Sequence, residues 1–506
     1  MRREIAVYPH NASGSPQLAS GGGSVFAEVL THRLTLFPVT TLPNPHSDQP
    51  RTDDTASADT TASAESTSPA DVPSGPRRFL PPTVSGVLAA LGIIIATIVT
   101  TIQVRVTDFP IDMIIYREGV KAFMQGGEVY SVPMMAGDIA LPFIYPPFGA
   151  LAMVPLAGDW FSNDMAGDIM IILSNLLIGL LIILLAHALN KQRTLPFAAS
   201  DVFGVAFLIW GIMLIFEPVR LNNGFAQINI VIMALVALDL IPRKRLKWLP
   251  QGWLIGIAAA IKITPLAMLL YFLLRKEIKP IITAAVSAVV ATLIAAAVRW
   301  DVAWEFFSVK LLSMGSGGDF GVQTAYQSNS SIKGFIERLY PSEQAMDDAA
   351  LMSTIIWFIF AVATVVLGGW LMVALMRRGL SIEAWMVNAF IMLLISPVSW
   401  SHHWIWIAIA IPVLFYRALT WRHLNWVSGI LVSILAAWSF MVLTVPPKWY
   451  LGDGINVWEL NMAMKIVVSD FVWMAILTML ATAYMLRFVP RIDKAQSTSD
   501  SVPAKH

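Results

Sequence analysis

The sequence predicts an all-α polytopic membrane protein, and its composition is the first indication. Hydrophobic residues make up 56% of the 506 residues and charged residues only 13%, with a mean hydropathy of +0.66. Soluble globular domains carry about 25% charged residues, so this chain suits lipid better than water. The second indication is that long apolar runs alternate with short polar segments from residue 84 onward. Such alternation is typical of helices that cross a bilayer.

Charge and cysteine content exclude several classes of protein. The formal net charge is +1, which leaves no basic surface large enough for nucleic acid, so we expect no nucleic-acid partner. The chain contains no cysteine, which excludes disulfides, thiol catalysis and cysteine-ligated metals. Membrane lipids are the surroundings that this composition requires.

Composition divides the chain into three parts. Residues 47–76 are rich in Ser, Thr, Asp, Ala and Pro and contain almost nothing that could pack, so we expect residues 1–83 to be a disordered cytoplasmic tail. Residues 84–488 contain the apolar runs and form the predicted membrane domain. Residues 489–506 predict a cytoplasmic C-terminal tail.

Clusters of positive charge predict which end of each apolar run faces the cytoplasm. If every cluster is cytoplasmic, the chain makes an even number of crossings between any two of them. The clusters are Arg77 with Arg78, Lys191 with Arg193, 243–247, 275–279, Arg377 with Arg378, Arg417 with Arg422, and Arg487 with Arg491.

The predicted elements follow from the apolar runs in order. Together with the short elements described next, they predict about ten to thirteen membrane helices in all. The runs expected to cross fully are 84–103, 168–189, 201–217, 227–241, 281–299, 351–376, 384–396, 404–416, 424–443 and 466–486.

Two apolar runs are too short, or wrongly flanked, for a full crossing. The run between Arg245 and Arg275 is basic at both ends and cannot hold two spans of about 20 residues, which predicts a broken hairpin of two half-helices with its apex at Lys262 to Pro265. A full crossing at 145–156 would place Lys191 outside, which predicts a short or re-entrant helix there.

This topology places nearly all the chemically suggestive side chains on the outer face. An active site at that face follows, with the bilayer as the source of at least one substrate. The predicted outer segments are Asp108 to Leu141, Glu217 to Gln227, Trp300 to Ala350, Ser396 to His403, and Thr444 to Lys465.

Five motifs in order resemble one known family. They read IDMIIYREGVKAFMQGGEVY, LPFIYPPF, EPVRLNNGFAQIN, IKITP and SPVSWSHHW, and they span about residues 105–410. This order is similar to the polyprenyl-phosphate-mannose-dependent α-(1→2)-mannosyltransferases of actinobacteria, members of glycosyltransferase family 87 in the GT-C superfamily. The resemblance implies an inverting enzyme at the outer face of the plasma membrane that takes mannose from a lipid-linked phosphate donor. The implied acceptor is a lipoglycan: lipomannan, lipoarabinomannan or a phosphatidylinositol mannoside.

The same resemblance implies Asp112 as the catalytic base, with Tyr116 beside it. Two motifs depart from the family. Asn329-Ser330-Ser331-Ile332 stands where relatives often read Asn-Gln-Ser-Leu, so the role of Asn329 transfers less directly. The usual Gly-Gln-x-Asn is read here as Gly224-Phe225-Ala226-Gln227-Ile228-Asn229, two residues longer.

Chemistry supports a carboxylate base independently. A mannosyl phosphate already carries a good leaving group, so one carboxylate that deprotonates the acceptor hydroxyl is sufficient. Asp112 fits this role, although it could instead cap the amphipathic helix expected at 113–124. Asp108 is the second candidate, for acceptor binding or simply as a solvated residue at a helix end.

The departing phosphate requires fixed donors of positive charge or hydrogen bonds. The candidates are Lys262, His402, His403 and Arg220. An ammonium in an apolar hairpin is costly, which favours a functional Lys262. The two histidines could instead belong to an aromatic interface belt with Trp400 and Trp404, and Arg220 could merely pair with Glu217.

Aromatic and amide side chains complete the predicted site. Tyr145 precedes Pro146-Pro147, a rigid turn that could stack on a sugar or a prenyl chain, or simply begin a helix. Gln227 could bind sugar hydroxyls, as could the other amides of its segment. The Gly-rich stretch 315–321 could order over the substrate, although plain disorder is the simpler reading.

Two other functions compete with the mannosyltransferase. A decaprenyl-phosphate-arabinose-dependent arabinofuranosyltransferase would share these motifs. A transporter or flippase would also have many helices, but it would place its ligands near mid-membrane, and no inverted repeat is evident. Adjacent histidines make a poor chelate, so no metal or other cofactor is expected.

Overall fold

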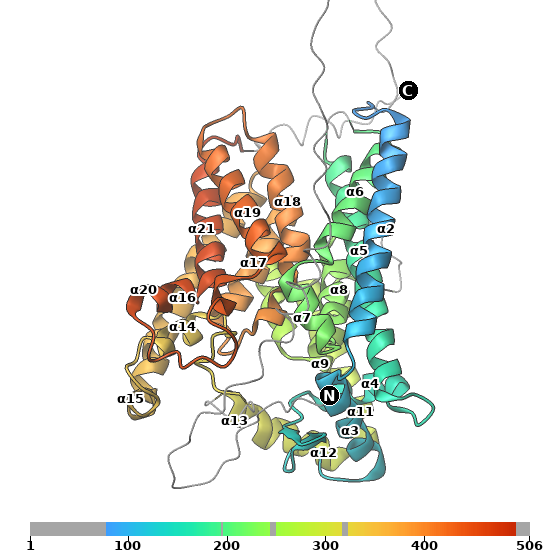
Figure 1. Ribbon diagram of the computed structural model, residues 1–506, viewed down its shortest axis with the longest axis vertical. Helices are drawn as coiled ribbons and strands as arrows, with labels where there is room; N and C mark the ends of the chain where they lie inside the picture. The colour runs from blue at the N-terminus through green and yellow to red at the C-terminus, as the bar shows by residue number, and fades with distance from the viewer. Residues whose placement is uncertain (1–76, 194–195, 243–248, 316–321, 492–506) are drawn as a thin grey trace, which may run out of the picture.

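The structure is a computed structural model that describes residues 77–193, 196–242, 249–315 and 322–491. Most of the predicted tail 1–83, nearly all of the predicted tail 489–506, and residues 316–321 of the Gly-rich stretch 315–321 lie outside the described residues. The described part is mainly helical, as the composition predicts (Figure 1).

Six helices of the described part are long and apolar enough to cross a membrane. The bent pair α6 (Ala199–Met213) and α7 (Glu217–Gly224), which turns by 61°, would make a seventh. Five further apolar helices have 10–17 residues, so the total of ten to thirteen stays a prediction. The six are α2 (Pro82–Val106), α5 (Asn163–Lys191), α11 (Ile278–Val298), α16 (Ala350–Met376), η3 (Ser401–Trp406) with α18 (Ile407–Thr420), and α19 (Val427–Leu443) with η4 (Pro447–Trp449).

The shorter elements connect these helices or complete the bundle. The five shorter apolar helices are α4 (Pro147–Ala157), α8 (Asn229–Leu240), η1 (Thr264–Leu269) with α10 (Leu270–Arg275), α17 (Ser381–Ile395) and α21 (Asp470–Met485). The remaining elements are α3 (Ile111–Gln125), β1 (Met134–Ala136), β2 (Ile139–Leu141), α9 (Trp253–Ile261), α12 (Trp300–Glu305), η2 (Phe306–Lys310), α13 (Leu311–Gly315), α14 (Ile332–Arg338), α15 (Glu343–Asp348) and α20 (Met462–Val467). Strands β1 and β2 form an antiparallel hairpin.

The described basic clusters gather at one end of the molecule, as the charge pattern predicts. In Figure 1 this is the upper end, where α2 begins, whereas α3, α12, α15 and α20 lie at the lower end. Contacts join several clusters directly: Arg193 to Tyr416, Arg417 to Glu383 and Gln192, and Arg378 to Leu486 and Val489.

The predicted broken hairpin is present. Helix α9 ends at Lys262, whose backbone is extended, and η1 with α10 brings the chain back. Gln251, just before α9, and Arg275, at the end of α10, line one polar pocket together with Pro242 and Ser381. Both ends of the hairpin therefore lie at the basic end, and its apex points into the bundle. The predicted short helix at 145–156 is α4.

A buried aromatic cluster forms the core of the C-terminal half. Trp404 lies 5.6 Å from Phe471 and 6.1 Å from Trp438, measured between ring centroids, and Phe390 stacks against it. Trp404 is fully buried, so it does not belong to an interface belt. That alternative for the histidine motif is wrong for Trp404, because its ring packs on three helices of the bundle.

Candidate active site

Asp112 lies inside α3 rather than at its cap. The helix begins at Ile111, and its N-cap residue, Pro110, makes no side-chain capping bond. The Asp112 carboxylate instead accepts a 2.6 Å hydrogen bond from Gln227 Nε2, which comes from a turn 115 residues later in the chain. The capping alternative is therefore wrong, because the carboxylate points toward the neighbouring helices.

Burial raises the pKa of Asp112 to about 6, because an ionised carboxylate loses hydration there. The Gln227 hydrogen bond and the positive charge of Lys262 oppose this rise. The carboxylate is thus deprotonated at neutral pH and more basic than an exposed aspartate. These are the properties that a general base needs.

Gln227 is the centre of the polar cluster around Asp112. Its Oε1 atom accepts hydrogen bonds from the Tyr116 hydroxyl at 2.7 Å, from Asn229 Nδ2 at 3.0 Å and from the Tyr145 hydroxyl at 3.3 Å. The two tyrosine hydroxyls lie 2.7 Å apart. Because its oxygen receives these donors, the amide is oriented with its NH2 group toward the carboxylate.

Lys262 reaches this cluster from the apex of the broken hairpin. Its Nζ atom donates a 2.8 Å hydrogen bond to Asn229 Oδ1 and lies 5.4 Å from the centre of the Tyr145 ring. An unbroken path therefore runs from Lys262 through Asn229 and Gln227 to Asp112. The structure brings together five predicted site residues, which come from four segments: Asp112, Tyr116, Tyr145, Gln227 and Lys262.

The turn before Gln227 explains the apparent insertion in its motif. Ala226 has φ 51°, in the left-handed region that glycine favours. Read back from Asn229, the residues Ala226-Gln227-Ile228-Asn229 match Gly-Gln-x-Asn with alanine in the glycine position. The backbone at Ala226 thus allows the motif to be read at its usual length, without the two extra residues.

His403 shares a cavity with Lys262. The cavity is polar at Asn229, Lys262, Ser399 and His403. Apolar residues also line it: Ile232, Met392, Leu393, Ile405 and Trp406.

His402 lies beside His403. Its ring centroid is 4.7 Å from that of His403 and 5.3 Å from that of Phe225. Its Nε2 atom is buried without a hydrogen-bond partner among the described residues. Buried imidazole nitrogens are usually hydrogen-bonded, so an unpartnered one is uncommon.

The other predicted residues lie outside the cluster. Asp108 is exposed and lies between α2 and α3, outside the hydrogen-bonded cluster of Gln227. Arg220 donates to the Thr444 carbonyl at 3.0 Å. The charge of Glu217 acts on Arg220 from a distance, but within the described segments no ion pair closer than 4 Å joins the two, so the close pair is not formed. The reason is that Glu217 points to Ser401 and Trp449 instead.

Asn329 has a structural role in this arrangement. Its Oδ1 atom accepts from Ser399 N at 2.9 Å, and its Nδ2 atom donates to the carbonyls of Thr324 and Pro397. It thereby holds the loop before η3 against the loop before α14. Asn223 likewise bonds Gln103 and Asn175 on α2 and α5, so it joins helices and does not face the cluster.

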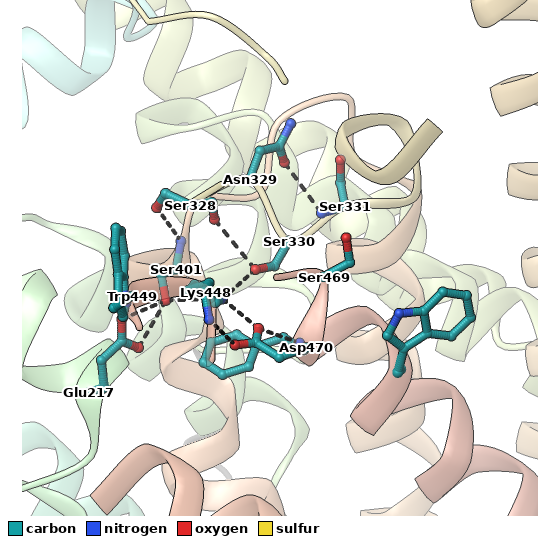
Figure 2. A network of polar contacts seen from close by, with 12 residues as sticks. Glu217, Ser328, Asn329, Ser330, Ser331, Ser401, Lys448, Trp449, Ser469 and Asp470 are labelled. Atoms are coloured by element: carbon teal, nitrogen blue, oxygen red, sulfur yellow. Dashed lines mark hydrogen bonds and ion pairs between the residues drawn. The ribbon is translucent and has the colours of Figure 1, made fainter. Parts of the chain in front are cut away.

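A second buried polar network escaped the sequence prediction. Figure 2 shows Lys448 at its centre, with its Nζ atom 3.0 Å from Asp470 Oδ1 and 2.6 Å from Ser330 Oγ. Ser401 Oγ donates to the Glu217 carboxylate at 2.8 Å, and Trp449 Nε1 donates to the same group at 2.7 Å. This network fixes the residue that precedes the two histidines.

The comparison with protein families identifies the family of the chain. Residues 143–397 match the model of glycosyltransferase family 87. The chain belongs to glycosyltransferase family 87. It is therefore a glycosyltransferase of the GT-C type, and the apolar helices make it a multi-pass membrane protein.

Curated relatives of this family 87 chain are mycobacterial. A polyprenol-phosphate-mannose-dependent alpha-(1-2)-phosphatidylinositol mannoside mannosyltransferase of Mycolicibacterium smegmatis is 29% identical over 388 residues, 72% of this chain and 82% of the relative. The enzyme of the same name from Mycobacterium tuberculosis is 32% identical over 327 residues, 63% of this chain and 73% of the relative. A polyprenol-phosphate-mannose-dependent alpha-(1-2)-phosphatidylinositol pentamannoside mannosyltransferase of M. smegmatis is 26% identical over 390 residues, 75% of this chain and 85% of the relative. No solved structure matches.

Side chains that could bind a metal do not cluster in the described part of the chain. Within the described ranges, no three His, Asp or Glu side chains lie in position to hold one ion. The expectation that the reaction needs no metal stays a prediction.

Proposed function

We propose that this family 87 enzyme transfers mannose from polyprenyl-phosphate-mannose to a hydroxyl of a phosphatidylinositol mannoside, forming an α-(1→2) bond with inversion. The observation that carries the proposal is the buried Asp112 carboxylate, held by Gln227 at 2.6 Å within a cluster that ends at Lys262. The donor and acceptor classes come from the names of the mycobacterial relatives. A larger lipomannan-type acceptor is the alternative within the same chemistry.

In the proposed reaction, Asp112 removes the proton from the acceptor hydroxyl. The acceptor oxygen then bonds to the anomeric carbon of mannose while the bond from that carbon to the phosphate oxygen breaks. The electron pair of the broken bond stays on the phosphate, and the proton stays on Asp112 until it passes to solvent. Attack opposite the leaving phosphate converts a β-linked donor into an α-linked product.

The departing polyprenyl phosphate is placed at Lys262 and His403. Positive charge and hydrogen-bond donors stabilise a leaving phosphate. The cavity they share continues into apolar residues, which suits the first units of a prenyl chain. Arg220 and Asn329 then act on the site indirectly, through the loops they hold.

The orientation of the enzyme follows from its basic end. Positive loops stay in the cytoplasm, so the end with α3 faces outward from the plasma membrane. Lipid-linked donor and acceptor would meet the cluster at that surface.

Purified enzyme in nanodiscs tests this proposal with polyprenyl-phosphate-mannose and a phosphatidylinositol mannoside. We expect Asp112→Asn to lower turnover by about a thousandfold, because a general base contributes on that order. Asp108→Asn is the matched control, since it removes an exposed carboxylate four residues away, and it should keep turnover within about twofold.

Three outcomes would overturn parts of the proposal. Near-native turnover by Asp112→Asn removes the base assignment. Transfer from a decaprenyl-phosphate-arabinose donor without transfer from the mannose donor removes the sugar assignment. Movement of donor lipid across the bilayer without any product would indicate a flippase.

A further inference from the structure

Residues 300–312 form a helical segment with three distinct sides. The segment comprises α12, η2 and the start of α13. Figure 1 shows it lying across the lower end of the molecule, at the same end as α3, rather than along the long helices such as α2. It is therefore placed where the spanning helices end.

The first side of this segment packs on the protein. Val302, Ala303 and Phe306 are buried, and the Phe306 ring lies 5.3 Å from the Tyr130 ring. The second side is polar over its first two turns, with Asp301, Glu305 and Ser308 about one turn apart from one another, and the exposed Val309 and Leu312 follow it. A helix between protein and water needs only these two sides.

The third side consists of large apolar residues that are exposed. Trp300 is 66% exposed, Trp304 is 65% exposed, and Phe307 follows on the same side, with spacings of four and three residues. The spacing places the three on one stripe, distinct from the polar side. In the part of the chain that the structure describes, no packing covers this stripe.

The stripe continues the lipid-facing surface of α11. On that helix Ile282, Val286, Val289 and Leu293 are all more than half exposed, with the same spacings of four, three and four. Helix α11 is one of the six that can span a membrane, so this surface faces lipid chains. The stripe begins two residues after α11 ends, at the level where a bilayer gives way to water. Tryptophan is enriched at that level.

The segment is clamped to α3 at its beginning. Arg299 donates to the carbonyls of Phe123 at 3.0 Å, Gly127 at 3.2 Å and Ala122 at 3.3 Å, which lie at the end of α3. Its guanidinium also pairs with Asp301 at 2.6 Å. Helix α3 carries Asp112 in its first turn.

A second set of contacts leads from the segment toward the site. Phe306 touches Tyr130, whose hydroxyl donates to the Tyr145 carbonyl at 2.8 Å. Tyr145 in turn lies in the Gln227 cluster. The position of the segment and the position of the active site are thus mechanically joined at two places.

We propose that residues 300–312 seat in the headgroup layer of the phospholipid bilayer that surrounds the enzyme, with Trp300, Trp304 and Phe307 inserted. This contact sets the height of α3 and Asp112 above the membrane, where a lipid-anchored acceptor presents its sugar. The seating itself is independent of the reaction catalysed. Its effect on acceptor use rests on the proposed function.

Depth-dependent quenching tests the seating directly. The chain has no cysteine, so single cysteines can carry an environment-sensitive fluorophore without background. The probe positions are Trp304→Cys and Phe307→Cys, with Ser308→Cys as the neighbour on the polar side. Ile98→Cys on α2 and Gln344→Cys on α15 are references for lipid and water, because both side chains are exposed.

In nanodiscs, the probes at 304 and 307 should lose roughly half of their emission to a headgroup-level nitroxide lipid and little to aqueous iodide. The probe at 308 should respond mainly to iodide. Iodide quenching at 304 equal to that at 344 would overturn the proposal and would indicate that the stripe is a binding surface for another protein. Strongest quenching at 304 by a mid-chain nitroxide, as at 98, would also overturn it.

An activity comparison tests the effect on acceptor use. The double variant Trp300→Ser with Trp304→Ser should lower transfer to an acceptor embedded in vesicles by about tenfold, because the site then lies at the wrong depth for the sugar that the embedded acceptor presents. Transfer to a short water-soluble mannoside should change by less than about twofold. Trp426→Ser, which removes an exposed tryptophan elsewhere, is the control and should change neither rate.

Equal loss with both acceptors would assign the tryptophans to folding and overturn the effect on acceptor use. Unchanged transfer to both acceptors would overturn it as well. If the native enzyme transfers no mannose at all, the proposed function fails while the quenching result still decides the seating.

Discussion

Lys448 Nζ lies 3.0 Å from Asp470 Oδ1, and the side chains are 0% and 3% exposed. The ammonium also lies over the Phe471 ring, 3.4 Å from its centroid. Glu217, bonded through Ser401, brings a second carboxylate to the same network. Removing one member of such a buried pair leaves the other without a counter-charge.

Lys448→Met should therefore lower the free energy of unfolding by about 3–5 kcal/mol, because Asp470 is left buried and unpaired. Combining Lys448→Met with Asp470→Leu should recover most of this loss. Unfolding in detergent, followed by thermal shift, measures both. Lys121→Met is the control, since its pair with Glu118 is partly exposed and is worth about 0.5 kcal/mol. A single Lys448→Met variant as stable as the native enzyme would contradict the prediction.

The pH dependence of transfer should report the ionisation of Asp112. The base acts as a carboxylate, and burial raises its pKa to about 6. Turnover should accordingly be level above that pH and should fall about tenfold for each pH unit below it. Gln227→Leu removes a hydrogen bond that stabilises the carboxylate, so the midpoint should move to higher pH. A midpoint near 4 in the native enzyme would show that Asp112 is not the titrating base.

The same burial predicts an effect on stability. A carboxyl group whose pKa is raised on folding favours the protonated form. Its cost to stability therefore builds between about pH 4 and about pH 6 and stays on the order of 3 kcal/mol above that. Asp112→Asn should raise the melting temperature at pH 7.5 and leave it nearly unchanged at pH 4. Thermal unfolding at the two pH values checks this difference. A variant that melts lower than the native enzyme at pH 7.5 would argue against it.

Ala226→Gly should stabilise the enzyme by about 1 kcal/mol, because φ 51° suits glycine better than alanine. The matched control is Ala206→Gly in the interior of α6, where glycine should cost about 1 kcal/mol. Melting temperatures of the two variants should therefore move in opposite directions. A shift in the same direction would indicate that Ala226 is not strained in the native enzyme.

Asn329→Ala should act on stability rather than on substrate binding. Its side chain makes four hydrogen bonds to backbone groups, so its loss should cost about 1–3 kcal/mol. The KM for donor and acceptor, measured below the melting transition, should stay within about twofold of the native values. A large rise in KM without a change in melting temperature would restore Asn329 as a substrate-binding residue.

Part of the fold and the site could be predicted from the sequence because local signals carry them. Hydropathy located α2, α5, α11 and α16. The basic clusters predicted that the loops that carry them lie at the same end of the bundle. The Lys262 hairpin could be predicted from the cost of a charge and a proline inside an apolar run.

The remaining features depend on contacts that the sequence does not display. Asn222 and Asn223 look like sugar-binding amides, but both are buried. Asn222 donates to the Gln227 carbonyl in its own turn, and Asn223 bonds Gln103 and Asn175 on two other helices. Lys448 and Asp470 each resemble an ordinary charge near a helix end, and only tertiary packing brings them together. The acid at the start of the apolar run 466–486 was the one available signal, because a carboxylate beside a span is costly unless it is paired.

The hydrogen bond between Asp112 and Gln227 joins a part of the chain that the family model covers to a part that it does not cover. Gln227, Lys262 and Tyr145 lie within residues 143–397, the region that the family model recognises, whereas Asp112 precedes that region and His403 follows it. The recognised region alone therefore lacks both the proposed base and the histidines. A fragment limited to residues 143–397 should insert into membranes but should not catalyse transfer. The flanking segments are therefore as necessary to the enzyme as the region that defines its family.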